Sequence, residues 1–77
     1  MPLFYFNLDD HVRDVDLEGT ELADVAEARV AAIVFAGAYL RDNPGLITDG
    51  RDFRVEVADE NGIVLFTVHI ELIEPGQ

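Results

Sequence analysis

The chain has 77 residues and a formal net charge of −11, because 16 acidic side chains stand against five arginines and no lysine. Nucleic acids and anionic membrane surfaces bind clusters of Lys and Arg, so this charge excludes both as partners. The absence of cysteine rules out disulfides and thiolate metal sites, and 49% hydrophobic residues rule out a disordered acidic tail.

The first predicted element is a strand over residues 3–8 (LFYFNL). Both of its faces are largely apolar, so we expect it in the middle of a sheet. Residues 9–11 then form a turn. Residues 12–17 (VRDVDL) alternate weakly and predict a short edge strand, in which the aspartates discourage pairing with other chains.

A single helix is predicted from residue 25 to residue 41 or 42. Asp24 is the expected N-cap, and Glu27 stands at the capping-box position three residues later. Pro44 ends the helix, because proline cannot continue it and forces the preceding residue into an extended conformation.

The C-terminal part predicts a β-hairpin. After a loop over residues 46–52, residues 53–58 (FRVEVA) alternate between apolar and charged. Residues 59–62 (DENG) form the hairpin loop and residues 63–72 the last strand, followed by a tail over 73–77. The expected fold is therefore one compact α+β domain over residues 1–77, of order β-β-α-β-β, with an antiparallel sheet of about four strands and one helix packed on one face.

The predicted helix lacks a polar face. Phe35 and Tyr39 are its large side chains and should contact the sheet, yet the opposite side is apolar as well. A helix that is apolar all round is buried all round, and a second copy of the chain is the simplest cover. We therefore predict a homodimer whose interface contains Val30, Ala31, Val34, Gly37, Ala38 and Arg41.

Two alternatives to this interface remain. Val30 and Val34 would need no explanation if they were singly exposed apolar residues, which are common on protein surfaces. Two copies could also associate by pairing sheet edges, through residues 12–17 or 63–72.

An acidic segment is the second candidate site. It contains Asp9, Asp10, His11, Asp14 and Asp16. Carboxylates and an imidazole could attract a basic protein partner or a divalent cation. The spacing matches no calcium loop, however, and a solvated acidic turn explains the same residues.

No catalytic constellation is visible. The chain has no serine and no cysteine, its glycines form no phosphate-binding loop, and the nearest approach to a dyad is Thr67 with His69 on one strand face. We therefore expect no enzymatic activity, no cofactor and no metal site. A recognisable leader and a membrane-spanning run are also missing, so the expected location is the cytoplasm.

The motifs MPLFYFNL, LEGTEL, DVAEAR and DFRVEVADENGIVLFTVHI occur in this order along the chain. In that order they resemble a family of short bacterial proteins known only as a domain of unknown function. Its members open with a Tyr/Phe-rich strand, continue through E-G-x-E-L and an A-R helix start, and close with a W-R-V-x-V-x-D-x-x-G hairpin. Here Phe53 replaces the usual Trp, and His69 stands where Pro is frequent. The resemblance implies a compact bacterial cytoplasmic domain and carries no activity with it.

Overall fold

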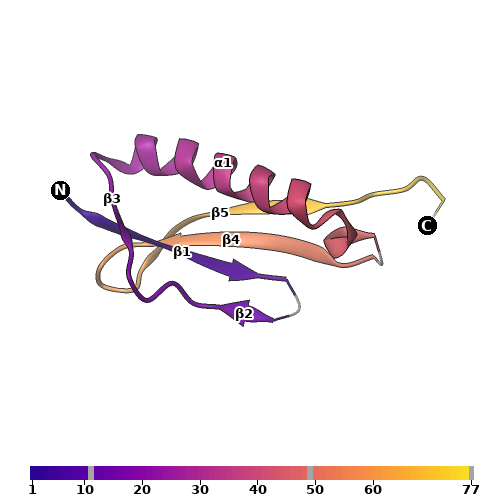
Figure 1. The fold of residues 1–77 in the computed structure, drawn as a ribbon, viewed down its shortest axis with the longest axis horizontal. Coiled ribbons are helices and arrows are strands. Elements are labelled where there is room, and N and C mark those ends of the chain that lie inside the picture. The colour runs from indigo at the N-terminus through magenta and orange to yellow at the C-terminus, as the bar shows by residue number, and fades with distance from the viewer. Residues whose placement is uncertain (11, 49, 77) are drawn as a thin grey trace.

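In the computed structural model, which describes residues 1–10, 12–48 and 50–76, one helix lies across one face of an antiparallel sheet (Figure 1). The α+β prediction, with the helix between two groups of strands, is confirmed. The elements are β1 (Leu3–Asp9), β2 (Arg13–Asp14), β3 (Thr20–Glu21), α1 (Val25–Asp42), a 3₁₀ turn η1 (Pro44–Ile47), β4 (Asp52–Ala58) and β5 (Val64–Glu71).

The strands of the sheet run in the order β2-β1-β4-β5, with β3 also paired to β1. As predicted, β1 is central: one edge pairs with β4 over Tyr5–Asp9, and the other edge pairs with the two short strands. The single edge strand predicted over 12–17 is wrong in detail. Of this range only Arg13–Asp14 pairs with β1, as β2 at its end. The strand β3, which was not predicted, pairs with the beginning of β1, and the sheet of the described residues therefore has five strands.

The core lies between α1 and the sheet. The helix turns a row of alanines inward, and the facing side chains of β4 are fully buried, as the alternation of residues 53–58 predicts. Small alanine side chains let the helix axis lie close to the sheet, so that larger strand residues fill the space between them. The buried cluster consists of Phe4, Leu8, Ala28, Ala32, Ala36, Phe53, Val55 and Val57.

The ends of α1 have the predicted chemistry. The Asp24 side chain accepts a hydrogen bond from the Glu27 N–H at 2.9 Å, as an N-cap should. At the other end the Asn43 N–H donates to the carbonyls of Tyr39 and Leu40, and Pro44 opens the 3₁₀ turn. None of the helices in the described part of the chain is long and apolar enough to span a membrane.

Strand β5 has two features that the alternation of its sequence does not indicate. The register shifts between Val57 and Ala58, so that Val64 pairs with Ala58 whereas Phe66 pairs with Val57. Because of this bulge, Val64 and Phe66 pair with neighbouring residues of β4, although simple alternation along β5 would place both on one face. Within the described chain β5 pairs with β4 alone, which leaves the outer edge of this strand open (Figure 1).

Replacing the N-cap residue should measure how much the helix start contributes to stability. Asp24→Ala removes the acceptor for the Glu27 N–H, and we expect it to lower the free energy of unfolding by about 1 kcal/mol. Asp24→Ser, which restores an acceptor, should recover most of that loss. Urea unfolding followed by circular dichroism measures both, and equal stability of the alanine and serine variants would contradict the capping role.

Candidate functional site

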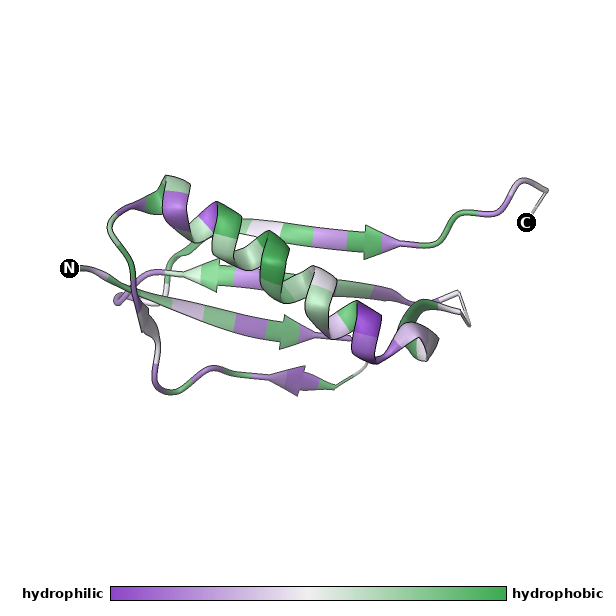
Figure 2. Cartoon of the chain, turned by 45° about the horizontal axis from the view of Figure 1, so that its top comes forward, coloured by the Kyte–Doolittle hydropathy of each residue, from purple (hydrophilic) through white to green (hydrophobic). Residues whose placement is uncertain are grey.

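The outward side of α1 carries exposed apolar residues, and hydrophobic colours prevail in the middle of the helix in Figure 2. Val30, Ile33 and Val34 are 63%, 62% and 64% exposed, although valine and isoleucine are among the residues most often buried in globular proteins. Among the predicted interface residues, Val30, Val34, Gly37 and Arg41 are exposed, and Ala31 and Ala38 are half-buried. Ile33 belongs to the same surface, although the prediction did not include it. We call the exposed residues Val30, Ile33, Val34 and Gly37 the outer helix face.

Gly37 lies on the outer helix face without a structural reason inside the chain. A Cβ added there would meet no described atom within 4 Å. Glycine in a helix interior lowers stability by about 1 kcal/mol relative to alanine. Since the isolated chain has room for an alanine side chain at this position, packing within the chain does not explain the glycine. A missing side chain is of use where another backbone approaches the helix closely.

The residues of the predicted acidic segment do not converge on one point. Asp9 lies 3.8 Å from Arg13 Nη1, and the Asp10 side chain accepts a hydrogen bond from the Val12 N–H. His11 lies outside the described residues. Asp14 is exposed on β2, and Asp16 is turned into the chain. Within the described ranges no group of three or more His, Asp or Glu side chains could hold a metal ion.

Asp16 occupies the gap between β2 and β3 and replaces the missing strand pairing. Its Oδ2 accepts the Phe6 N–H of β1 at 3.1 Å, and its Oδ1 accepts the N–H groups of Glu18 and Gly19, both at 3.1 Å. Its own N–H donates to the Asn7 side chain at 2.9 Å. Gly19 closes this turn with a φ of 76°, which glycine adopts without strain.

These donors keep Asp16 ionised. Partial burial raises the pKa of this carboxyl, but hydrogen bonds from the backbone N–H groups of Gly19, Phe6 and Glu18 together lower it by more. The pKa is therefore below its ordinary value of 3.8, and a fixed negative charge remains at the edge of the sheet at neutral pH. The bonds to Glu18 and Gly19 are local, as in an Asx turn, whereas the bond to Phe6 depends on how β1 pairs and has no local sign in the sequence.

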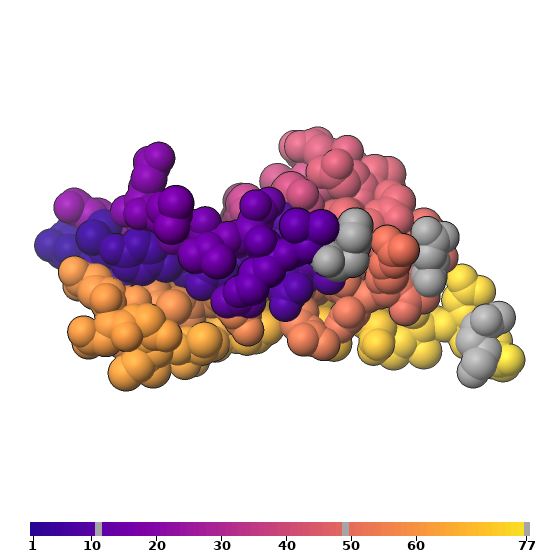
Figure 3. All heavy atoms as spheres, turned by 90° about the horizontal axis from the view of Figure 1, so that it is seen from below, coloured from indigo at the N-terminus to yellow at the C-terminus, as the bar shows by residue number. Residues whose placement is uncertain are grey.

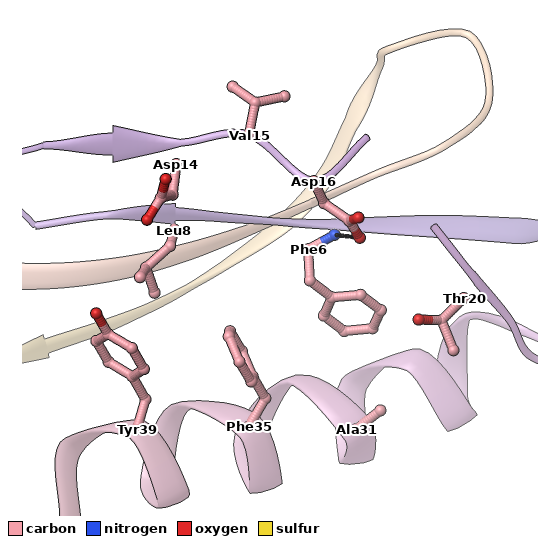
Figure 4. Close-up of a pocket in the computed structure, with 9 residues that line it drawn as sticks. All are labelled: Phe6, Leu8, Asp14, Val15, Asp16, Thr20, Ala31, Phe35 and Tyr39. Carbon is pink, nitrogen blue, oxygen red and sulfur yellow. Dashed lines mark hydrogen bonds between the residues drawn. The ribbon is translucent and has the colours of Figure 1, made fainter. Parts of the chain in front are cut away.

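A groove lies between this edge and the flank of α1 (Figure 4). Its volume is about 540 Å³, and its walls are mostly apolar. The rings of Phe6 and Phe35 meet edge to face at a centroid distance of 6.5 Å, and Phe35 is 6.1 Å from Tyr39. The groove is lined by Phe6, Leu8, Asp14, Val15, Asp16, Thr20, Ala31, Phe35 and Tyr39.

A second, smaller hollow lies on the other side of the same edge. It has a volume of about 280 Å³ and runs between the segment around Arg13, Val15 and Asp16 and the loop that joins β4 to β5. Figure 3 shows these two segments side by side, the first in purple and the second in orange. Arg13 lies on this side, with Nη2 at 2.8 Å from Glu56 Oε1, so its charge is neutralised away from the groove.

A polar cluster lies on the sheet face opposite the helix. His69 Nε2 lies 2.7 Å from Asp52 Oδ2, which also accepts a hydrogen bond from Arg54 at 2.8 Å. The contact with His69, followed by that with Arg54, holds the pKa of Asp52 below its ordinary value. This arrangement gives His69 a carboxylate partner on β4, whereas the sequence suggested Thr67. The side chains of Arg54 and His69 are exposed and that of Asp52 is partly exposed, as expected for a cross-strand ion cluster.

Comparisons with known proteins give one finding. A family model described as "Domain of unknown function (DUF6894)" matches residues 3–71, which takes in every strand and the helix. No curated protein and no solved structure matches the chain.

The bonds of Asp16 lead to a stability prediction. Asp16→Ala leaves three backbone N–H groups without their charged acceptor, and we expect a loss of about 2 kcal/mol in the free energy of unfolding at pH 7. Because the folded-state pKa is depressed, this contribution is complete above the ordinary pKa of 3.8 and is lost as the pH falls through the lower folded value.

The control for this prediction is Asp14→Ala, which removes a carboxylate from the same edge where it is exposed. Urea unfolding at a series of pH values measures both variants. The stability gap between wild type and Asp16→Ala should narrow in acid, and the gap to Asp14→Ala should stay small throughout. Equal effects of the two substitutions at neutral pH would show that the backbone bonds of Asp16 contribute nothing.

Proposed function

The chain belongs to the DUF6894 family, and we propose that it acts as a non-enzymatic interaction module that forms a homodimer through the outer helix face. The observation that carries the proposal is the exposure of Val30, Ile33 and Val34 in one continuous patch. Contiguous apolar patches on monomers mark interaction sites, whereas isolated apolar residues do not. The proposed setting is the bacterial cytoplasm, which the family resemblance implies.

A two-fold arrangement fits the charges at the ends of this face. Val34 is midway between Glu27 and Arg41, which are separated by 14 positions in the sequence and therefore by about 21 Å along the helix. If two helices cross antiparallel at Val34, each Glu27 approaches the Arg41 of the other copy. Both residues are exposed, so the pairs would contribute orientation more than affinity.

Gly37 supports the same arrangement. It lies one turn from Val34, and the space above it is open in the chain. Two helices that cross near Val34 could therefore approach backbone to backbone, which brings the valine and isoleucine side chains of both copies into contact. The cost of glycine in the helix would then be offset by the interface.

The net charge opposes this association. Each copy carries −11, so two copies repel each other at neutral pH, and the apolar contact must overcome that repulsion. Salt screens exposed charges and has little effect on apolar burial. A homodimer of this kind should therefore become tighter as salt is added, whereas binding of a basic partner to the acidic surface would become weaker.

The divalent-cation alternative receives less support from the described residues. The carboxylates of Asp9, Asp10 and Asp16 contact Arg13 or backbone N–H groups, and only Asp14 and Asp16 line the same groove. Two carboxylates beside aromatic rings supply too few oxygen ligands for calcium, which takes six to eight.

Val34→Asp tests the proposed interface. It places a charge at the centre of the apolar patch, and burial of that charge without a partner should raise the dimer dissociation constant by about 100-fold. Analytical ultracentrifugation over a concentration series measures the constant at about 0.1 M and about 1 M salt, between which the Debye length falls from about 10 Å to about 3 Å. The wild type should associate more strongly at the higher salt concentration.

Thr67→Asp is the matched control, since it adds the same charge at an exposed position of β5. Its dissociation constant should stay within about threefold of wild type, because a surface charge far from the contact acts only through screened repulsion. A larger effect of Thr67→Asp than of Val34→Asp would assign association to the open edge of β5 instead. A wild type that stays monomeric at all concentrations would refute the proposal.

A further inference from the structure

The groove between α1 and the divided edge combines two chemistries in one place. Its floor is made of rings: Phe6 comes from β1, and Phe35 and Tyr39 come from successive turns of α1 (Figure 4). The large side chain of Phe35 remains 38% exposed, although it contacts two other rings. Within the described chain this aromatic surface has no cover, and its position beside Ala31 leaves room for a side chain from outside.

Negative charge lies along one side of the groove. Asp14 and Asp16 line the groove, and none of the described lining residues is basic. Arg13, the nearest base in sequence, pairs with Glu56 on the opposite side of the edge. Asp16 keeps its charge through its backbone donors, and Asp14 is exposed on β2. The electrostatic complement of the groove is therefore a cation.

The aromatic floor decides which cation fits. A hydrated metal ion gains nothing from phenyl rings and would need more oxygen ligands than two aspartates provide. An arginine side chain meets both requirements. Its apolar stem and planar guanidinium can stack on Phe35 or Tyr39, and its N–H groups can bond to the Asp14 carboxylate. Lysine supplies charge without the planar surface, so it should bind more weakly.

The shape of the groove indicates a segment of another chain rather than an enclosed small molecule. It runs along α1 past Ala31, Phe35 and Tyr39 and is open to solvent along this length. We propose that this groove binds an arginine-containing peptide segment of a basic partner protein, with the arginine side chain over the Phe35 and Tyr39 rings and its guanidinium at Asp14. This site adjoins the outer helix face and does not depend on dimer formation.

Titration with a short peptide tests this site. The probe is Ac-Gly-Arg-Gly-Arg-Gly-NH₂, added to the isotope-labelled chain at about 0.15 M salt, where long-range attraction to the acidic surface is screened. Amide shifts should concentrate at Phe6, Ala31, Phe35 and Tyr39. The peptide with lysine in place of arginine should bind about threefold more weakly, because it loses stacking and bidentate bonding. The neutral citrulline peptide should not bind.

Two substitutions separate the groove from the general acidity of the chain. Ala31→Met fills the groove without a change of charge and should weaken arginine-peptide binding by about fivefold, through loss of contact with the rings. Ala26→Met places the same side chain at an exposed helix position outside the groove and should leave binding unchanged. Asp14→Asn should weaken binding by a similar factor and keeps the proposal testable if Ala31→Met disturbs the fold.

Three results would overturn the proposal. Shifts spread over all acidic residues, with equal affinity for the arginine and lysine peptides, would reduce the effect to non-specific attraction. Unchanged binding by both Ala31→Met and Asp14→Asn would place the contact elsewhere. Dissociation of a dimer by the peptide, together with loss of dimer in Ala31→Met, would identify the occupant as an arginine of a second copy rather than of another protein.

Discussion

The architecture depends on the contact between one side of α1 and the sheet. Ala28, Ala32 and Ala36 bring the helix close enough for Phe53 and Val55 to fill the interface completely. A sheet of this size covers one side of one helix and no more. Because the remaining sides of α1 are also apolar, the chain satisfies its own core and still presents hydrophobic surface to water. The surfaces from which we infer function exist because the sheet covers only one side of α1.

The two flanking surfaces differ in chemistry, and the difference originates at the edge of the sheet. On the outer helix face no carboxylate interrupts the row from Val30 to Gly37. On the flank that faces β2 and β3, Asp14 and Asp16 approach the aromatic side chains of the helix. One surface is therefore suited to an apolar partner that repeats the same patch, and the other to a cationic partner. A single helix can serve both because they occupy different sides of it.

Much of the fold could be predicted from local patterns. The bounds of α1, its cap at Asp24 and the inward residues of β4 follow from capping chemistry and period-two alternation, and these are the strongest local signals a sequence contains. The division of the edge strand could not be predicted. It depends on the carboxylate of Asp16 reaching the Phe6 N–H ten residues away, and alternation in residues 12–17 carries no trace of that bond. The bulge beside Val64 could not be predicted either, because it depends on the register between β4 and β5.

The candidate surfaces, like the fold, could be predicted only where they follow from a local sequence pattern. The helical period identified the outer helix face and five of the apolar positions on or beside it, but it missed Ile33 and grouped Ala31 with that face, whereas Ala31 also lines the groove. The pairing of His69 with Asp52 joins residues 17 positions apart across two strands, and only the register of β4 and β5 reveals it. The layers of the fold and the central place of β1 could be predicted, whereas individual side-chain contacts between elements could not.

The open edge of β5 has a consequence for how the protein behaves in concentrated solution. Alternate residues of this eight-residue strand turn unpaired backbone groups outward, no proline or lysine hinders a neighbouring strand, and the bulge lies near the beginning of the strand. At neutral pH each copy carries a net charge of −11, and the repulsion between copies opposes the pairing of such edges. The isoelectric point is about 4.1, so acidification to that value removes the barrier. Proton concentration therefore sets how strongly two copies of the chain repel each other where this edge is open.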